Sequence, residues 1–563
     1  MSQTTLFTGR IWSACTGDLD ALLVDDGRVV ATGDRARERA SEIGAVEHEV
    51  PTLLLPAFGD GHAHPLFGGL ESEGPAIRGC TSVEEIVAEV ARYATAHPDL
   101  DVIRGASYDA SLVDGGLFDA RWLDEAAPGR PVVLRAWDYH TVWVSTATLE
   151  RCGITAQTPD PPLGEIARRP DGSPLGTLRE WGAVDLVTDV LGEWDVETMV
   201  RSVERAGRAY AALGVTWVQD AWVTPAELPA WLRAAREDRL PVRFDLALHA
   251  DPRRWPDQLE EILAMREQVR ALGHPHLRAE SVKFFADGVV ENATAALLEP
   301  YATLLDGSRP EEHAACGCPV DGMMVWPPEQ LAEAVTAVDA HGLQPHIHAI
   351  GDRAVRAALD AVGAAEAANG RRDRRAVVAH VQLVDPADRA RFAELGVIAN
   401  AEPLWAQLDD LMTVLTVPRL GQPRVDEQYC LADLHALGAP LSFGSDWPVS
   451  SADPLEGMAV ACSRQTQDRV PEGGWVPEQR LPVEAALAAY TLGSAHQARR
   501  DAGCLDPGCV AGGPPVADLV ELTADPRDLP SPRDIDGIRV RRTWLAGRAV
   551  HPSPGTDEAG APR

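Results

Sequence analysis

Two histidines stand two positions apart at the end of a short apolar run. The segment reads Leu53-Leu-Leu-Pro-Ala-Phe-Gly-Asp-Gly-His-Ala-His64, a β-forming stretch that ends in a glycine-flanked turn. Because alternate side chains of a strand share a face, the imidazoles of His62 and His64 are expected to project together. Neutral imidazoles bind zinc at about 2.0–2.1 Å. The pair therefore indicates part of a metal site, although ordinary loop histidines would give the same pattern.

Further side chains that can bind a metal follow later apolar runs in the chain. The residues are Lys283 in 279–287, His346 and His348 in 343–352, His380 in 376–382, and Asp446 in 441–448. In a parallel barrel the chemistry lies at the carboxyl ends of the strands. These residues are therefore predicted to meet His62 and His64 at one end of such a barrel.

The elements that must position them alternate between strands and helices. We predict strands at 53–61, 215–220, 242–249, 280–286, 343–349, 376–381, 396–401 and 440–446. Amphipathic helices are predicted at Pro327–His341, Arg353–Ala368 and Pro482–Thr491. Eight strands that alternate with helices predict an α/β chain with a (β/α)8 TIM barrel.

The regions that flank the barrel contain short predicted strands without the alternating helices. Residues 1–52 contain a hairpin signal, Asp-Gly between two β-rich runs in Ala21–Gly33, and 501–551 contain short β segments at Val516–Leu522 and Thr543–Val550. We expect both termini to form one small β-sandwich beside a barrel at 53–500. The gap after the first barrel strand is too long for one crossover, which predicts an inserted subdomain at about 70–210. Residues 552–563, rich in Pro, Gly and Ala, are predicted to be a disordered tail.

Composition excludes several classes of function. The chain has 563 residues, with 51 Lys and Arg against 85 Asp and Glu, a net charge of −34. Such a charge repels nucleic acid and anionic membranes, so neither is expected as a partner. The sequence has no apolar run long enough to span a bilayer and no signal-like N-terminus, which favours a cytoplasmic protein. Nine scattered cysteines favour reduced thiols over a disulfide framework.

Together the motifs resemble the amidohydrolase superfamily, in the branch of YtcJ-like proteins and N-substituted formamide deformylases. The resemblance covers nearly the whole chain and rests on five segments: His62-Ala-His64, Val282–Tyr301, His348-Ala-Ile-Gly-Asp-Arg-Ala-Val355, His380, and Gly444-Ser-Asp-Trp-Pro-Val449. The departures are Ala57 and Gly59, where a Gly and an apolar residue are usual, and the inserted region. These departures affect substrate choice more than the metal site.

The resemblance implies a ligand set. His62, His64 and Asp446 would bind one divalent ion, most plausibly zinc, and His348 and His380 a second. Lys283 would bridge the two ions if CO₂ converts its amine to a carbamate, since a protonated lysine would be repelled by them. An unmodified Lys283 would instead favour a single-metal site.

The chemistry expected from this set is hydrolysis of a small molecule by a metal-activated hydroxide. Asp446 would take the proton of the attacking water and deliver it to the departing amine. The expected substrate is an N-substituted amide or formamide, with a non-peptide carbon–nitrogen bond. Hydrolysis of a cyclic amide, carbamate or lactone is the alternative. A catalytically inactive barrel that binds or regulates is a second alternative, and a homodimer is possible.

Secondary candidates complete the predicted site. His346 shares a face with His348 and could replace it as a ligand. His140 resembles a position of the family insertion that lies near the substrate, so it could contact the carbonyl oxygen and assist catalysis, or it could be an ordinary surface or core histidine. Trp405 and Trp447, with Phe285, could form an apolar substrate wall or belong to the core. Asp220 and His249 end the second and third predicted strands and could serve structure or the site.

Overall fold

A parallel eight-stranded barrel forms the centre of the molecule. The computed structural model describes residues 4–192, 194–304, 307–313, 320–509 and 513–552. The sheet order is β17-β16-β15-β14-β13-β12-β11-β5, with every neighbouring pair parallel. The strands are β5 (Phe58–Ala63), β11 (Val215–Val223), β12 (Arg243–His249), β13 (Leu277–Phe285), β14 (Gln344–Ala349), β15 (Val377–His380), β16 (Ile398–Ala401) and β17 (Leu441–Phe443). This arrangement confirms the predicted α/β barrel.

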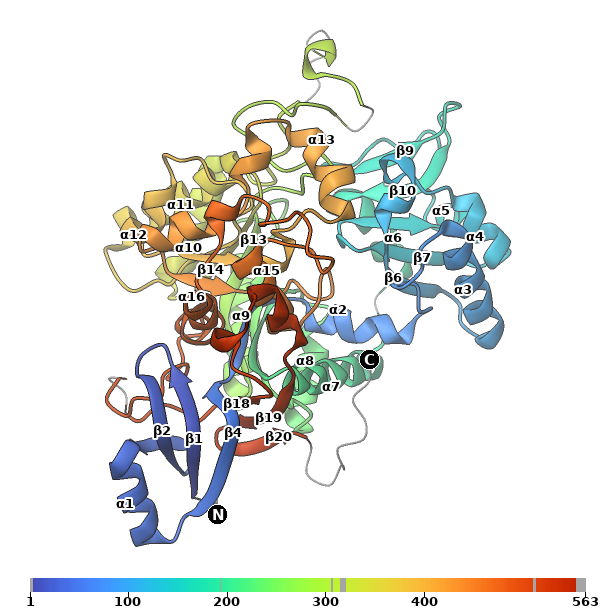
Figure 1. Cartoon of the computed structure of the whole chain (residues 1–563). Helices are drawn as coiled ribbons and strands as arrows, with labels where there is room; N and C mark the ends of the chain where they lie inside the picture. Colours follow the sequence, from blue (N-terminus) through green and yellow to red (C-terminus); the bar gives the residue numbers. More distant parts are fainter. Residues whose placement is uncertain (1–3, 193, 305–306, 314–319, 510–512, 553–563) are drawn as a thin grey trace.

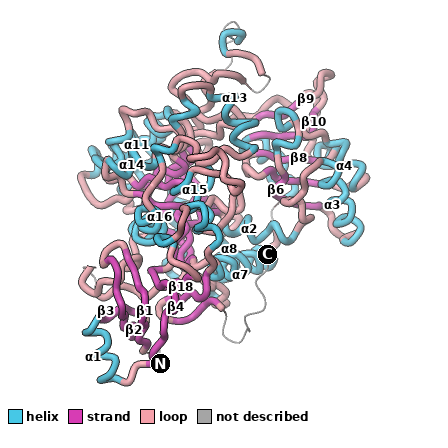
Figure 2. The backbone as a smooth tube through the Cα atoms, in the orientation of Figure 1, coloured by secondary structure: helices cyan, strands magenta, loops and turns pink. Residues whose placement is uncertain are grey.

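Helices surround this barrel and share its core (Figures 1 and 2). Apolar positions at helical spacing bury one face of each long helix against the strands. The helices are α2 (Pro65–Leu70), α7 (Val196–Ala212), α8 (Leu228–Arg236), α9 (Leu259–Leu272), α10 (Pro328–Ala340), α11 (Asp352–Asn369), α12 (Arg389–Leu395), α13 (Val417–Leu420), α14 (Leu431–Ala436), α15 (Pro454–Ser463), α16 (Val483–Ala488) and α17 (Ser494–Gln497).

The predicted first strand, 53–61, is two strands that belong to different sheets. β4 (Val46–Pro56) pairs with β18 (Leu519–Leu522) from Leu53 to Pro56, and β5 then pairs with β11. The partner changes at one peptide, because the Ala57 amide donates to Asp518 at 2.9 Å and the Phe58 amide to Gly214 at 3.0 Å. The chain thus leads from the terminal sheet directly into the barrel.

Both termini build one seven-stranded sheet, in the order β20-β19-β18-β4-β1-β2-β3. The other strands are β1 (Thr5–Ser13), β2 (Gly17–Asp25), β3 (Arg28–Thr32), β19 (Val540–Leu545) and β20 (Arg548–His551), and α1 (Gly33–Ile43) covers part of one face. An isolated bridge joins Arg28 to Val516, so the sheet curls on itself around a core that includes Phe7, Leu22 and Trp544. The expected two-layer sandwich is therefore a single curled sheet, because β4 is long enough to pair with both terminal segments.

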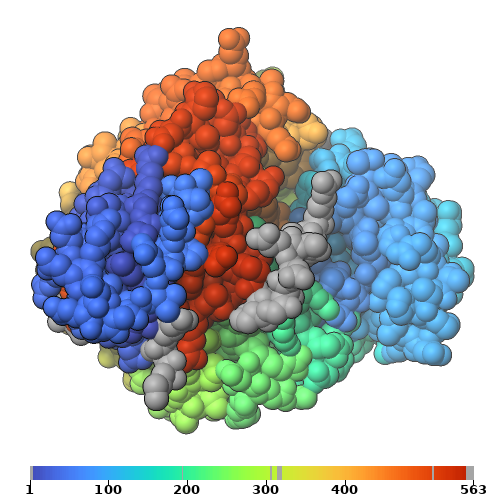
Figure 3. Space-filling view, turned by 60° about the horizontal axis from the view of Figure 1, so that its bottom comes forward, coloured from blue at the N-terminus to red at the C-terminus, as the bar shows by residue number. Residues whose placement is uncertain are grey.

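The insertion forms a separate lobe beside the barrel (Figures 1 and 3). Its five-stranded sheet has the order β6-β7-β8-β10-β9, with four helices. The elements are α3 (Val83–Ala96), β6 (Ile103–Tyr108), α4 (Ala120–Ala126), β7 (Val132–Ala136), β8 (Thr141–Val144), α5 (Thr146–Arg151), β9 (Glu165–Arg168), β10 (Pro174–Arg179) and α6 (Glu180–Leu191). The predicted end near residue 210 is too late, since α7 packs on α2, α8 and β11 as a barrel helix.

Two further predictions concern membrane-spanning helices and the C-terminal tail. Among the described helices, none combines the length and the apolar character that crossing a membrane requires. The predicted tail at 552–563 lies outside the described residues apart from Pro552.

Candidate active site

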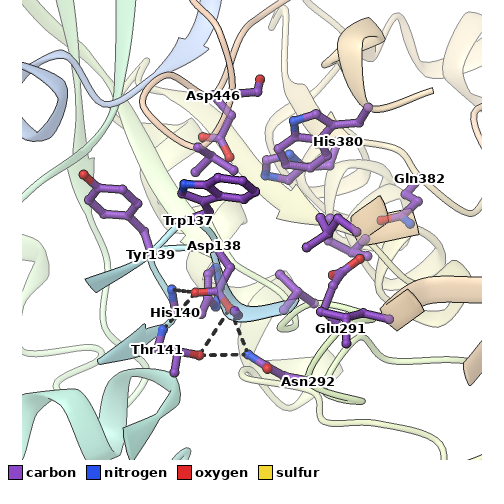
Figure 4. Close-up of a pocket in the computed structure, with 18 of the residues that line it drawn as sticks. Trp137, Asp138, Tyr139, His140, Thr141, Glu291, Asn292, His380, Gln382 and Asp446 are labelled. Carbon is purple, nitrogen blue, oxygen red and sulfur yellow. Dashed lines mark hydrogen bonds between the residues drawn. The ribbon is translucent and has the colours of Figure 1, made fainter. Parts of the chain in front are cut away.

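A cavity of about 260 Å³ lies between the carboxyl ends of the barrel strands and the inserted lobe. His62, His64, Lys283, His348, His380 and Asp446 all line it. The inserted lobe contributes Asp138, His140 and Arg179, and the segment after β16 contributes Met412 and Arg419. Figure 4 shows His380 and Asp446 in one part of this cavity and His140, Thr141 and Asn292 in another. The six predicted metal ligands, His140 and Trp405 therefore line one cavity.

His62, His64 and Asp446 form the tightest group in the cavity. Each offers a ligand atom, and these atoms lie within 4.8 Å of one another. The Oδ1 atom of Asp446 is 3.0 Å from Nε2 of His64 and 3.5 Å from Nε2 of His62. All three side chains are buried. Two imidazoles and one carboxylate in this arrangement suit a divalent ion of the zinc class.

Barrel closure places these three residues together. The strands β5 and β17 do not pair along their length, but the amide of Asp446 donates to the His62 carbonyl at 2.7 Å. The His64 amide donates to the Trp447 carbonyl, also at 2.7 Å. A Cβ atom at Gly444 would lie 2.7 Å from the His62 nitrogen, so only glycine permits this approach. Asp446 itself has a φ of 52°, a strained conformation that is typical of functional positions.

His348 and His380 form a second group beside the first. Their ring centroids lie 4.5 Å apart, and the His380 ring lies 4.6 Å from that of His62. The Nδ1 atom of His380 contacts Glu402 at 2.8 Å, while its buried Nε2 has no hydrogen-bond partner among the described residues. The Nε2 atom of His348 lies 3.1 Å from the Gly288 carbonyl and 3.5 Å from Oδ1 of Asp287. The unpartnered Nε2 of His380 is therefore the atom of this group that is open to a second ion.

Lys283 lies on β13 between the two groups. Its side chain is fully buried, and Nζ is 3.2 Å from Nε2 of His62. Burial lowers the pKa of Lys283 to about 7, although Asp446, Glu402 and Asp220 oppose that change. A substantial fraction of the amine is therefore unprotonated near neutral pH.

The electrostatics of the site suit metal ligands. Burial lowers the pKa of His62, His64 and His348, so these imidazoles are neutral and keep a lone pair for a cation. Burial acts to raise the pKa of Asp446, but the hydrogen bond with His64 and the nearby His380 and Lys283 outweigh it and hold the pKa below its ordinary value. The site thus combines neutral imidazoles with an ionised carboxylate.

His346 does not take the place of His348 in the cavity. Its Nε2 atom lies 2.8 Å from Nδ1 of His62, on the side of that ring away from Asp446. Such a contact to the second nitrogen of a metal-binding imidazole fixes the orientation of the ring. His346 is therefore placed to position His62.

His140 reaches the cavity from the inserted lobe. Its Nδ1 atom lies 2.9 Å from Oε2 of Glu180, and Thr294 donates to the other oxygen of Glu180 at 2.6 Å. Burial acts to lower the pKa of His140, but Glu180 and Asp138 outweigh it and raise the pKa above its ordinary value. The ring of His140 is 5.7 Å from that of His348. Glu180 therefore favours the protonated form of this imidazole, which faces the histidine cluster.

The two tryptophans predicted to contact substrate lie in different places. Trp405 lines the cavity and stacks on His380, with centroids 5.3 Å apart and an interplanar angle of 3°. Trp447 is not among the cavity residues; it packs against Gly68 of α2 and Tyr210 of α7. The prediction for Trp447 is therefore corrected. Asp446 points into the cavity, and its neighbour Trp447 points away from the cavity and into the helix layer. Phe285 lines the cavity as expected.

Several buried acids near the site were missed by the sequence analysis. Asp60 accepts hydrogen bonds from Ser445 and Tyr210, which joins β5 to the Asp446 loop. Glu402 directly follows β16, so the strand-end rule could have found it. Glu180 gave no sequence signal, because its role depends on contact with His140. Of the secondary candidates, Asp220 is buried, and burial raises the pKa of its carboxyl well above the ordinary value. His249 lies opposite Lys283 in the sheet register.

Several known proteins are similar to this chain in sequence. The chain is 30% identical over 552 residues to Protein LONG AFTER FAR-RED 3 of Arabidopsis thaliana, covering 95% of this chain and 88% of the relative. It is 26% identical to the putative amidohydrolase YtcJ of Bacillus subtilis, covering 94% and 96%. It is 24% identical to N-substituted formamide deformylase of Arthrobacter pascens, covering 94% of each.

A solved structure has a similar fold. An uncharacterized metal-dependent hydrolase from Pyrococcus furiosus superposes with a TM-score of 0.69 at 25% identity, covering 93% of this chain and all of that one. The model of the amidohydrolase family matches residues 52–551, which include the barrel and the C-terminal strands. The chain therefore belongs to the amidohydrolase family.

Proposed function

We propose that this amidohydrolase-family hydrolase cleaves a non-peptide carbon–nitrogen bond in an N-substituted amide or formamide. The observation that carries the proposal is the convergence of His62, His64 and Asp446 within 4.8 Å in an enclosed cavity. The similarity to a formamide deformylase supports the bond type.

The ligand set fits one or two divalent ions, and zinc is the best match to its imidazole and carboxylate donors. His62, His64 and Asp446 would hold one ion. His348 and His380 would hold a second ion. The Nε2 atom of His380 has no other partner among the described residues. We propose that Lys283 forms a carbamate with CO₂ and bridges the two ions, because a neutral amine can react with CO₂ and an ammonium cannot. Without that modification, a single ion is expected.

When bound, the metal would lower the pKa of a coordinated water to near neutral, and it would also polarise the substrate carbonyl. Asp446 lies in the same group and is ionised, so it can accept the proton of the attacking water. The same carboxyl can then protonate the departing amine. His140, whose pKa Glu180 raises, would donate a hydrogen bond to the carbonyl oxygen. Trp405 and Phe285 exclude water and contact the apolar part of the substrate.

The central experiment measures hydrolysis of a panel of N-substituted formamides and amides. We expect formate or the carboxylate, together with the free amine, and we expect chelation to abolish turnover and zinc to restore it. Asp446→Asn should keep the fold, measured by circular dichroism, and reduce kcat by about 10²–10⁴-fold. Wild-type turnover in that variant would refute the role of Asp446.

The same panel includes cyclic amides, carbamates and lactones, since the site could open these bonds by the same chemistry. Preferential turnover of one of these compounds would replace the proposed substrate class but keep the mechanism. Tight binding without turnover, in metal-loaded protein and across the whole panel, would favour a catalytically inactive binding barrel.

A further inference from the structure

Three cysteine side chains converge outside the active site, on the sheet that the two termini share. Cys15, Cys504 and Cys509 each offer a sulfur atom, and the three atoms lie within 4.8 Å of one another. The Sγ atoms of Cys15 and Cys509 are 3.8 Å apart. Cys504 is buried, while Cys15 and Cys509 are exposed. No disulfide joins any of the cysteines in the described part of the chain.

Packing brings Cys15 next to Cys504 and Cys509, although Cys15 and Cys509 are nearly 500 residues apart in the sequence. Cys15 lies in the turn between β1 and β2, where Ser13 and Thr16 hydroxyls bond at 2.8 Å. On the other side, Leu505 is buried in the core of the terminal sheet and anchors the segment that follows Cys504. The Cys509 amide donates to the Asp506 carbonyl at 3.0 Å, which closes a turn and returns Cys509 toward Cys504.

The geometry matches thiolate coordination better than a disulfide. Zinc–sulfur bonds of about 2.3 Å at tetrahedral angles place two sulfurs about 3.8 Å apart, the separation found for Cys15 and Cys509. A disulfide would require about 2.05 Å. The Asp506 amide also donates to the Cys504 sulfur at 3.4 Å, and such a bond stabilises a thiolate.

A negative side chain beside the three sulfurs favours a cation there. The carboxylate of Asp506 adds negative charge beside Cys15. Soft thiolate ligands select zinc-class ions over magnesium or calcium.

We infer that Cys15, Cys504 and Cys509 form a second metal site, which binds a zinc-class ion and ties the N-terminal turn to the C-terminal segment. Three sulfur–metal bonds form, and the three thiols release their protons to solvent. A water or the Asp506 carboxylate completes the coordination. The site is structural, since no cavity residue contacts it among those described.

The test uses full-length protein, reduced and loaded with Co²⁺. The barrel site has only nitrogen and oxygen donors, so a thiolate-to-cobalt charge-transfer band reports the cysteine site alone. We expect this band in the wild type, and we expect Cys15→Ser/Cys509→Ser to lose it together with one equivalent of bound metal. These two residues are exposed, so their replacement leaves the core intact. Hydrolase activity should remain at the wild-type level.

Cys80→Ser/Cys152→Ser is the matched control, because these thiols are partly exposed and separate from the cluster. It should keep both the band and the metal content. Absence of the band in reduced wild-type protein would overturn the inference, and so would equal metal content in the two double variants. A Cys15–Cys509 disulfide that mass spectrometry finds in protein purified without oxidant would also overturn it.

Discussion

At the scale of single residues, the site depends on hydrogen-bonded pairs in which one side chain changes the pKa of the other. His140 and Glu180 are such a pair, joined at 2.9 Å. Burial alone would make His140 neutral, and Glu180 reverses this. The carboxylate is therefore the group that gives the inserted lobe a hydrogen-bond donor directed at the cavity.

Replacing Glu180 by Gln should move the pH dependence of kcat/KM. The raised pKa keeps His140 protonated until the pH rises through that value, so activity that needs the imidazolium is lost on the alkaline side. Without the carboxylate the pKa falls, and the alkaline limb should move about 1–3 pH units lower. Glu165→Gln, at a half-exposed acid of the same lobe, is the control. An unchanged pH profile in Glu180→Gln would contradict the role of the pair.

Lys283 gives a second prediction at this scale. Its pKa of about 7 means that the reactive neutral amine predominates above that pH and the ammonium below it. At fixed dissolved CO₂, uptake of ¹³CO₂ into metal-loaded protein should therefore rise as the pH increases through about 7. Carbon-13 NMR detects the carbamate directly. Lys283→Ala should lose the signal and most activity, and short carboxylic acids should restore part of the activity. If wild-type protein shows no carbamate signal, Lys283 is not carboxylated and a single-metal site is the better interpretation.

At the scale of elements, the contact between β12 and β18 joins the barrel to the terminal sheet. Arg243 donates to Asp518, and both side chains are buried, at 8% and 5% exposure. Asp518 also accepts from the Ala546 amide at 2.7 Å. One carboxylate, directly before β18, therefore contacts both β12 and the turn between β19 and β20.

Asp518→Ala should lower the free energy of unfolding by about 3–5 kcal/mol, because it leaves the Arg243 charge buried without a partner. Urea denaturation followed by tryptophan fluorescence measures this change. Glu89→Gln is the control, since its partner Arg92 is largely exposed and such surface pairs contribute about 0–1 kcal/mol. A loss below 1 kcal/mol for Asp518→Ala would show that the pair does not hold the two sheets together.

At the scale of the whole molecule, the cavity is built from two lobes. The barrel supplies the proposed metal ligands, whereas the inserted lobe and the segment after β16 form the opposite wall. Met412 lies in that wall, at the start of the π-helical turn η6 (Met412–Thr416). Chemistry and substrate size are thus controlled by different parts of the chain.

Met412→Ala should enlarge the space for the N-substituent. We expect kcat/KM for a bulky substrate to rise about 10-fold relative to a small one, the effect of one or two methylene groups in an apolar pocket. Bound metal should not change. Val414→Ala, on the exposed side of the same turn, is the control. An unchanged ratio would exclude Met412 from the substrate wall.

The sequence alone determined the barrel and the residues that enter its mouth. Strand and helix periodicities are local, and a ligand type that follows a strand must lie at the carboxyl end of that strand. The positions of His62, Lys283, His380 and Asp446 along the chain were therefore enough to assign them to one site. The Asp26-Gly27 turn was likewise predictable, since both residues adopt the positive φ that such a hairpin needs.

Only the tertiary structure decided which distant groups share a contact. Glu180 beside His140, His346 behind His62, and the three sulfurs of the terminal sheet all depend on packing between segments far apart in the chain. It also showed that Trp447 faces the core and that β4 leaves the terminal sheet at Ala57. The physical reason is that local spacing determines the direction of a side chain along its own element, whereas its partner depends on how whole elements pack.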